Sequence, residues 1–326
     1  MAYTMQDFAN LAKKEPLRAG VIDVLRRDSF IMDTLPWTPV ETLAVEFIKS
    51  GRLPTVAFRK IGNTFSESKA TVEPVTERVF NIGGYFDVDK AYVKSKQLID
   101  QRAYQAEQFV QAMAYSFNDY VINGSPIVDV DGFTGLFYRV ANELGSDQHI
   151  NVEAGAGLDV SMDSAALAAN QTKLIGYIDQ VIDACDQHEC DELWMNKSMR
   201  LALLAAIRDT GLFSKDQDNY GRKVVRWGEG GPIIRDLGVK ADQSTKIIGD
   251  LENLSGTPLT GGTATSIYAV RTGEDYLQGI NMGEVDTNDI GMLESGVAYR
   301  TVIDWFVGIT YLNPRSFARL SGIVAK

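Results

Sequence analysis

The sequence predicts an α+β protein in which a long two-stranded loop and one long helix extend from a mixed core. Three observations lead to this fold class. Apolar and polar residues alternate through residues 41–89, an apolar stripe with helical spacing runs from Ser95 to Ile122, and strands alternate with helices through residues 127–290. Alternation with a period of two is typical of strands, and recurrence at every third or fourth position is typical of helices.

Residues 1–40 are expected to form an N-terminal arm. Met5–Leu25 has helical spacing, but Pro16 and Gly20 interrupt it, so we predict two short helical pieces. Leu35–Pro39 is predicted to be extended, because a residue that precedes proline is disfavoured in the helical region.

Residues 41–89 are predicted to form an extended loop of two strands. The outgoing strand contains Leu43–Phe47 and a second apolar run at Thr55–Ile61. The returning strand spans Val75–Val88, and the polar segment Gly62–Ala70 makes the turn between them.

Gly83 and Gly84 are expected to mark a bend or bulge where the returning strand re-enters the body. An isolated hairpin is at best marginally stable in water, and this one carries few large apolar residues. We therefore expect it to need another surface, which is either its own body or a neighbouring subunit.

The strongest single element is the helix predicted from Ser95 to Ile122. Its apolar stripe consists of Ile99, Ala103, Ala106, Val110, Met113, Phe117 and Tyr120. The opposite face is predicted to be exposed and carries Lys96, Asp100, Glu107, Gln111 and Asn118. Asn123–Pro126 is predicted to end the helix, because it contains residues that readily adopt the left-handed conformation, followed by a proline.

The rest of the chain is predicted to form a mixed α/β layer followed by terminal strands. The expected helices are Asp163–Ala184 and a second one that is capped by Asn196 and Ser198 and ends at Asp209–Gly211. The expected strands are Glu192–Met195, Lys223–Trp227, Thr265–Arg271 and the final segment Val297–Lys326. Residues 211–262 hold ten of the 29 glycines, which indicates loops and short strands.

Composition excludes several classes of protein. The chain has 326 residues and a formal net charge of -11, with 45% hydrophobic and 23% charged residues, which is ordinary for a globular protein. The longest strongly apolar run, Leu201–Ile207, is far shorter than the ~20 residues that cross a bilayer. The first residues have neither a basic start nor an apolar signal core, so we do not expect secretion by that route, and the two cysteines are expected to be free thiols in a reducing compartment. An acidic chain without a basic stripe argues against tight nucleic-acid binding.

Two glycine- and aspartate-rich segments fail as ligand sites. Gly256–Thr263 matches a phosphate-binding loop except that Gly262 stands where the lysine is required, and a strand follows instead of a helix. Asp216–Gly221 resembles the first half of a calcium loop, but Trp227 occupies the position of the bidentate glutamate. We interpret both segments as polar loops.

Metal and catalytic sites are not predicted. Cys185, His188 and Cys190 cluster, but a tetrahedral zinc site requires four ligands, and the only other histidine is His149. No carboxylate pair, nucleophile elbow or dinucleotide fingerprint stands out. We therefore predict no catalytic residue, no cofactor and no metal, and interpret the protein as not being an enzyme.

The order of elements resembles the major capsid protein of tailed bacteriophages. Nearly the whole chain takes part in the resemblance: an arm, an extended loop, a long helix, a glycine-rich α/β region and terminal strands. The stretches that carry it most specifically are Leu53–Arg59, Glu73–Glu77, Gly83–Asp89 and Ser295–Arg300.

The resemblance implies a division into four parts: an N-terminal arm at 1–40, an extended loop at 41–89, a peripheral domain at 90–126 and 291–326 that includes the spine helix, and an axial domain at 127–290. It implies a structural protein of the virion, assembled in the host cytoplasm into hexamers and pentamers of an icosahedral shell around double-stranded DNA. The DNA is expected to be enclosed without sequence-specific binding, and no membrane is involved.

The same resemblance implies contacts with other copies and other proteins. Inter-subunit contacts are expected from the extended loop at Phe58, Arg59, Lys60, Phe65, Glu67 and Lys69. Because the chain begins near the arm at Met1, scaffolding is expected to be a separate chain, alongside a portal and decoration proteins. No covalent cross-link between subunits is predicted.

Two alternatives remain open from the sequence. A bacterial nanocompartment shell protein shares the architecture but encloses enzymes in place of a genome. A soluble α/β enzyme, from another class, predicts a compact monomer or small oligomer with a definite pocket.

Overall fold

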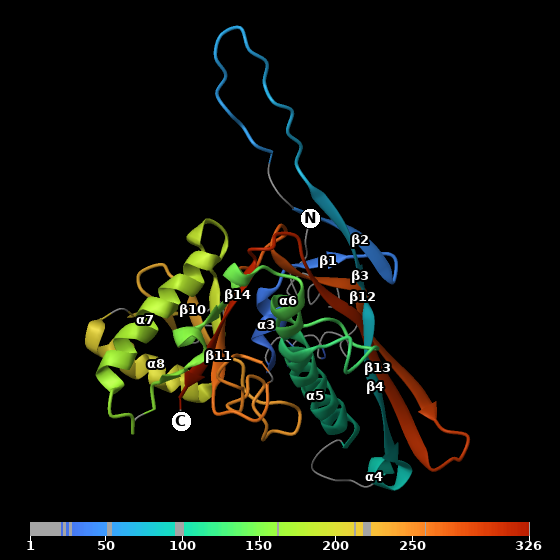
Figure 1. Ribbon diagram of the computed structural model, residues 1–326. Coiled ribbons are helices and arrows are strands. Elements are labelled where there is room, and N and C mark those ends of the chain that lie inside the picture. Colours follow the sequence, from blue (N-terminus) through green and yellow to red (C-terminus); the bar gives the residue numbers. More distant parts are fainter. Residues whose placement is uncertain are drawn as a thin grey trace.

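A computed structural model describes residues 21, 24–25, 28–50, 54–94, 101–161, 163–211, 213–217, 223–257 and 259–325. Two sheets and their helices form the body, and the loop that connects β2 to β3 of a hairpin projects far from it (Figure 1). The helices are α3 Phe30–Thr34, α4 Lys90–Lys94, α5 Gln101–Asn123, α6 Leu136–Asn142, α7 Leu167–Ala184 and α8 Lys197–Thr210. Short 3-10 turns lie at η2 Ser146–Gln148, η3 Val152–Gly155 and η4 Asp186–His188.

A four-stranded sheet has the order β1-β12-β13-β4. Its strands are β1 Trp37–Pro39, β12 Leu277–Met292, β13 Ala298–Tyr311 and β4 Phe80–Asp89. The three long strands pair antiparallel, and β1 adds in parallel to β12. Helix α5 covers one face, where Trp37 lies with its ring centroid 4.8 Å from that of Trp305 and 5.9 Å from that of Phe117.

The second sheet has the order β5-β14-β11-β7-β10-β9-β8, and β6 also pairs with β14. Its strands are β5 His149–Asn151, β6 Leu158–Asp159, β7 Glu192–Met195, β8 Phe213–Gln217, β9 Lys223–Trp227, β10 Ile233–Asp236, β11 Thr265–Val270 and β14 Phe317–Val324. Helices α7 and α8 pack against it (Figure 1).

The central strands β7 and β11 are buried on both faces. Leu193 and Met195 of β7 belong to the apolar core under α7 and α8, whereas Trp194 between them belongs to the core around α5. Strands buried on both faces are rich in apolar residues, as Leu193–Met195 and Ile267–Val270 show, and the polar residues Glu192, Thr265 and Ser266 at their starts are buried as well. The sheet therefore joins the two cores into one body.

Most predicted elements of the α/β layer are confirmed. Strands β7 and β9 have the predicted bounds, and α8 begins at Asn196, whose side chain accepts a hydrogen bond from the Met199 N–H, and ends at Gly211 with φ 69°. Helix α7 begins at Leu167, four residues later than predicted. Strand β12 was not predicted, because its Gly- and Asp-rich sequence does not alternate.

The long helix is confirmed from Gln101 to Asn123, and the predicted start at residues 95–100 lies outside the described residues. One prediction on its faces is wrong. Asn118 is buried, because its side-chain oxygen accepts a 2.5 Å hydrogen bond from the Ser29 hydroxyl at the start of α3. The predicted helical pieces at Met5–Leu25 fall mostly outside the described residues, and the extended segment before Pro39 is confirmed as β1.

The predicted two-stranded loop is shorter than expected. Strands pair only between β2 Ala44–Ser50 and β3 Val72–Arg78, and the predicted strand at Thr55–Ile61 is wrong, because residues 54–60 have no strand partner in the described chain. The returning run divides after Arg78, and its second half is β4, which belongs to the four-stranded sheet.

Gly83 and Gly84 do not form a bend or a bulge. They pair in unbroken register with Asp304 and Ile303 of β13. A Cβ atom at position 83 would lie 2.3 Å from the Ile303 carbonyl oxygen, and one at position 84 would lie 3.2 Å from the Phe109 ring. Close approach of the neighbouring strand and helix therefore explains these glycines.

The two sheets do not follow the domain boundary predicted at residue 290. That position falls inside β12, which pairs along most of its length with β13. Strand β14, from the predicted peripheral part, pairs with β11 in the middle of the eight-stranded sheet.

We expect Gly83→Ala to destabilise the protein by about 1–3 kcal/mol, because the added methyl group meets strand backbone that has to move. Gly176→Ala is the matched control. Position 176 lies inside α7 with no atom within 4 Å of the added Cβ, so alanine is expected to stabilise by about 0.5–1 kcal/mol. Thermal unfolding of both variants measures the difference, and equal effects of the two substitutions would contradict the close approach at Gly83.

Candidate assembly interface

Residues 54–71 form a loop that projects from the body beyond the hairpin β2–β3 (Figure 1). Every residue from 54 to 71 is exposed. Val56 is 90% exposed, and Phe58 and Ile61 are fully exposed. Exposed apolar side chains that gather on one segment are typical of a surface that binds a partner.

The loop has little internal structure of its own. The Asn63 N–H donates to the Lys60 carbonyl at 3.1 Å in a turn, and the Thr55 N–H donates to the Ser68 hydroxyl at 2.7 Å. Residues 54–60 and 63–70 carry no strand, so much of their backbone is open to water or to another chain.

The six residues that the resemblance singles out all lie on this exposed loop. The Arg59 guanidinium lies 5.1 Å from the centroid of the Phe65 ring and donates to the Asn63 carbonyl at 3.0 Å. Lys69 and Glu67 form a 3.2 Å ion pair with both side chains about four-fifths exposed. Phe58 and Lys60 point into solvent on the outgoing limb. The structure thus brings together two pairs among the six.

The hairpin β2–β3 has one face on the body and one in solvent. Phe47 and Lys49 of β2 are half-buried and buried, whereas Glu46 and Ile48 between them are exposed. Directly opposite residues share a face, so Val75, which pairs with Phe47, also lies on the inner face.

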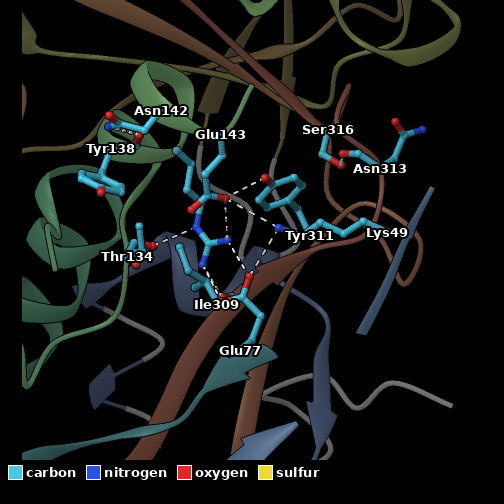
Figure 2. Close-up of polar contacts among 11 residues, drawn as sticks. Lys49, Glu77, Thr134, Tyr138, Asn142, Glu143, Ile309, Tyr311, Asn313 and Ser316 are labelled. Carbon is cyan, nitrogen blue, oxygen red and sulfur yellow. Dashed lines mark hydrogen bonds and ion pairs between the residues drawn. The ribbon is translucent and has the colours of Figure 1, made fainter. Parts of the chain in front are cut away.

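An arginine of the body holds the inner face. Arg139 of α6 is 1% exposed, and its two terminal nitrogens donate to the two Glu77 carboxylate oxygens of β3 at 2.7 and 3.0 Å (Figure 2). It also donates to the carbonyl oxygens of Thr134 and Ile309, each at 3.0 Å. A two-point arginine–carboxylate pair fixes direction as well as distance.

Lys49 of β2 completes the cluster (Figure 2). Its Nζ lies 3.6 Å from carboxylate oxygens of both Glu77 and Glu143, and 3.6 Å from the centroid of the Tyr311 ring. The Tyr311 hydroxyl donates to Glu143 at 2.7 Å. Two cations and two carboxylates therefore balance.

Burial shifts the ionisation of this cluster. It lowers the pKa of Lys49, and the nearby Arg139 lowers it further. It raises the pKa of the Tyr311 hydroxyl, and the Glu143 carboxylate acts in the same direction. Burial alone lowers the pKa of Arg139, but Glu77 reverses this effect and the net shift is upward, so the guanidinium stays charged.

The cluster, which we call the hairpin anchor, consists of Lys49, Glu77, Arg139, Glu143 and Tyr311. It was not predicted from the sequence, because its members come from separate elements: β2, β3, α6 with its C-cap residue Glu143, and β13. One signal was present: Arg139 stands among apolar residues in Leu136–Asn142, where a charge needs a buried partner.

The thiols of Cys185 and Cys190 lie near backbone carbonyl oxygens. The Cys190 thiol lies 3.1 Å from the Glu192 carbonyl oxygen, and the Cys185 thiol is buried near the carbonyl of Ala269. Across the described residues, no group of three or more His, Cys, Asp or Glu side chains could hold a metal ion. No described helix is both long and apolar enough to span a bilayer.

The other two tested segments are not assembled into sites. Gly256 has φ 82° and packs against Ser321 in a loop, with Pro258 outside the described residues. Asp216 lies in β8 and pairs with Arg226 at 2.8 Å, and residues 218–222 lie outside the described part.

Comparisons with known proteins identify relatives. A family model described as major capsid protein GP7 matches residues 14–178, slightly more than half of the chain. Among curated proteins, none matches.

Solved structures share the fold. The encapsulin of the holo-SrpI complex from Synechococcus elongatus PCC 7942 has a TM-score of 0.62 and 14% identity, over 91% of this chain and 88% of that one. The capsid of a native GTA particle has a TM-score of 0.58 and 14% identity, over 92% and 90%. A structure from Mycobacterium phage Bobi has a TM-score of 0.56 and 12% identity, over 91% and 90%. The predicted fold, that of tailed-phage major capsid proteins, is confirmed.

We expect Arg139→Met to destabilise the protein by about 3–5 kcal/mol, because it leaves the Glu77 and Glu143 carboxylates with Lys49 alone. Glu77→Met alone is expected to cost a similar amount, and the double variant less than the sum of the two. Chemical denaturation measures the free energies, and limited proteolysis of β2–β3 reports detachment of the hairpin.

Lys173→Ala is the control for this cycle. The Lys173–Glu153 ion pair lies on the surface, so its removal is expected to leave the free energy of unfolding unchanged. Strictly additive costs for Arg139→Met and Glu77→Met would show that the two side chains do not act as a pair.

Proposed function

The chain belongs to the family of the major capsid protein GP7, and from this premise we propose that it assembles as hexamers and pentamers into an icosahedral shell around double-stranded DNA. As a capsid protein it is a structural component of the virion. The observation that carries the proposal is the exposed apolar loop 54–71, set on a hairpin that the hairpin anchor holds against the body.

Apolar side chains of the loop are not covered by any described part of their own chain. Val56, Phe58 and Ile61 gain nothing from burial while they face water, and burying apolar surface is worth ~25 cal/mol per Å². A second copy supplies that burial. The loop and any surface that receives it are different parts of the chain, so the contact is head-to-tail, and such contacts close into rings when the rotation allows.

The domain roles are part of the proposal. Residues 1–40 and 41–89 act as the arm and the extended loop that reach other subunits, and Phe58, Arg59, Lys60, Phe65, Glu67 and Lys69 make inter-subunit contacts. Residues 90–126 with 291–326 serve as a peripheral domain and 127–290 as an axial domain, although the sheets cross this boundary.

The enclosed DNA and the other partners follow from the same proposal. A net charge of -11 keeps attraction to phosphate weak, so packed DNA is enclosed without sequence-specific binding. A separate scaffolding chain, a portal and decoration proteins take part, and assembly occurs in the host cytoplasm. The protein acts structurally and not as an enzyme.

A nanocompartment shell is the second candidate, and one observation favours it. The encapsulin of the holo-SrpI complex has a TM-score of 0.62 with this chain. The two functions share the shell and differ in what it encloses, so the contents distinguish them.

We expect shells purified from cells that produce the complete phage to contain double-stranded DNA that resists added nuclease. Ultraviolet absorbance and gel electrophoresis after nuclease treatment measure it, and shells opened before treatment are the control. Shells that hold one abundant protein and no protected DNA would favour the nanocompartment and contradict the proposal.

Deletion of Gly62–Ala70 is expected to abolish rings and shells while the subunit stays folded, because these exposed residues contribute nothing to the core. Electron microscopy and light scattering, with and without a candidate scaffold, measure assembly. The melting temperature is expected to change by no more than about 2 °C, since surface changes cost little.

Thr64→Ala is the matched control within the same loop, and it is expected to assemble normally. If the deletion unfolds the subunit, the loop has been placed wrongly. If the deleted protein still assembles, the loop is not the assembly contact.

A further inference from the structure

A second exposed apolar segment follows α5 directly. In Ser125–Gly132, Ile127 is 78% exposed, Val128 is 88% exposed and Val130 is 77% exposed. Asp129 and Asp131 each follow one of the two valines. We call this segment the acidic loop.

Internal hydrogen bonds give the acidic loop a defined shape. The N–H groups of Val128 and Asp129 donate to the Ser125 carbonyl at 3.1 and 2.9 Å. The Asp131 N–H donates to the Asp129 carboxylate at 3.1 Å, and the Tyr120 hydroxyl of α5 donates to the same carboxylate. A preformed loop loses little conformational entropy when a partner binds.

A cavity of about 420 Å³ lies beside the acidic loop. Val128 and Asp129 line it from the loop, and Tyr120, Asn123 and Lys240 line it from α5 and the region after β10. Tyr120 and Val128 give its wall an aromatic and apolar part, which suits an aromatic side chain. The charged lining residues are Asp119, Asp129 and Lys240, and because Lys240 pairs with Asp119 at 3.0 Å, the lining keeps a net charge of -1.

The projecting loop has the complementary composition. Residues 54–71 contain three cations, Arg59, Lys60 and Lys69, and one carboxylate, Glu67, which gives a net charge of +2. The acidic loop has two aspartates and no cation, which gives -2. Both segments expose large apolar side chains, so charge and apolar surface match at once.

We propose that loop 54–71 of one copy docks on the acidic loop of a second copy, with an aromatic side chain of the former against the cavity beside Val128. The proposal rests on the proposed shell function and names the surface that receives the loop. The loop of the same chain projects away from the body and leaves its own apolar side chains exposed, so a second copy is the partner (Figure 1).

A cross-linking experiment tests the contact directly. Full-length Phe58→Cys protein and full-length Val130→Cys protein are mixed under assembly conditions and oxidised with glutathione disulfide. A linked dimer that contains one of each variant is expected, and it should be at least ten times more abundant than the product of mixing Phe58→Cys with Leu201→Cys. Leu201 is also an exposed apolar residue but lies on α8. Wild-type protein reports any background from Cys185 and Cys190.

A charge exchange tests the same contact without new thiols. Lys60→Glu and Asp131→Lys are each expected to raise the protein concentration needed for assembly about tenfold, equivalent to about 1.4 kcal/mol. The double variant, which carries both exchanges in every copy, is expected to recover most of the loss. Melting temperatures are expected to stay unchanged, because both positions are exposed.

The outcomes separate this inference from the shell function. The docking site is overturned if shells form normally but Phe58→Cys and Val130→Cys fail to link and Asp131→Lys assembles like wild type. That result leaves the shell function intact. Asp131→Lys that assembles alone but no longer binds a scaffold protein shows another occupant and also overturns it. Wild-type protein that stays monomeric with and without scaffold contradicts the shell function itself.

Discussion

The two-point pair between Arg139 and Glu77 is the interaction on which the rest of this molecule depends. It joins a helix of the body to the strand that leads back from the projecting loop, at 2.7 and 3.0 Å. Lys49, Glu143 and Tyr311 surround it, so that every charge has a partner. Buried ion pairs often add little net stability compared with apolar packing, but they tolerate few alternative geometries. The hairpin anchor therefore holds the hairpin β2–β3 in one position on the body, and the loop projects from that hairpin.

The body to which the hairpin anchor is attached is closely packed and continuous. Strands β7 and β11 are buried on both faces and place alternate side chains in the two apolar cores, so the α5 side and the α7–α8 side share one sheet. On the other sheet, Trp37 packs between Phe117 and Trp305, and its ring covers Gly279, where a Cβ would lie 2.5 Å from the ring. Close packing of this kind resists deformation, so a contact at the loop is held by the whole body.

The surface differs from this closely packed body, because the projecting loop and the acidic loop each expose several apolar side chains to solvent. The projecting loop carries net positive charge and the acidic loop carries net negative charge, although the whole chain is acidic at -11. Uneven charge on an acidic protein favours ordered contacts between copies, while the overall negative charge limits unspecific association and attraction to DNA. The same arrangement serves a viral shell and a nanocompartment, which is why the contents and not the subunit distinguish the two.

Local sequence determined the elements whose signal lies in neighbouring residues. The apolar stripe of α5, the Asn196 cap and Gly211 end of α8, the buried run Glu192–Met195 and the shared order of elements could all be predicted, because propensity, capping and periodicity act within a few residues. Tertiary structure alone decided the rest. Thr55–Ile61 alternates like a strand but has no strand partner among the residues that the structure describes. Asn118 is buried, and its side chain accepts a hydrogen bond from Ser29, 89 residues away. β12 forms despite weak alternation because β13 pairs with it, and the hairpin anchor assembles from segments up to 262 residues apart, from Lys49 to Tyr311. Pairing and charge balance across such separations depend on which segments meet in space, and local sequence does not contain that information.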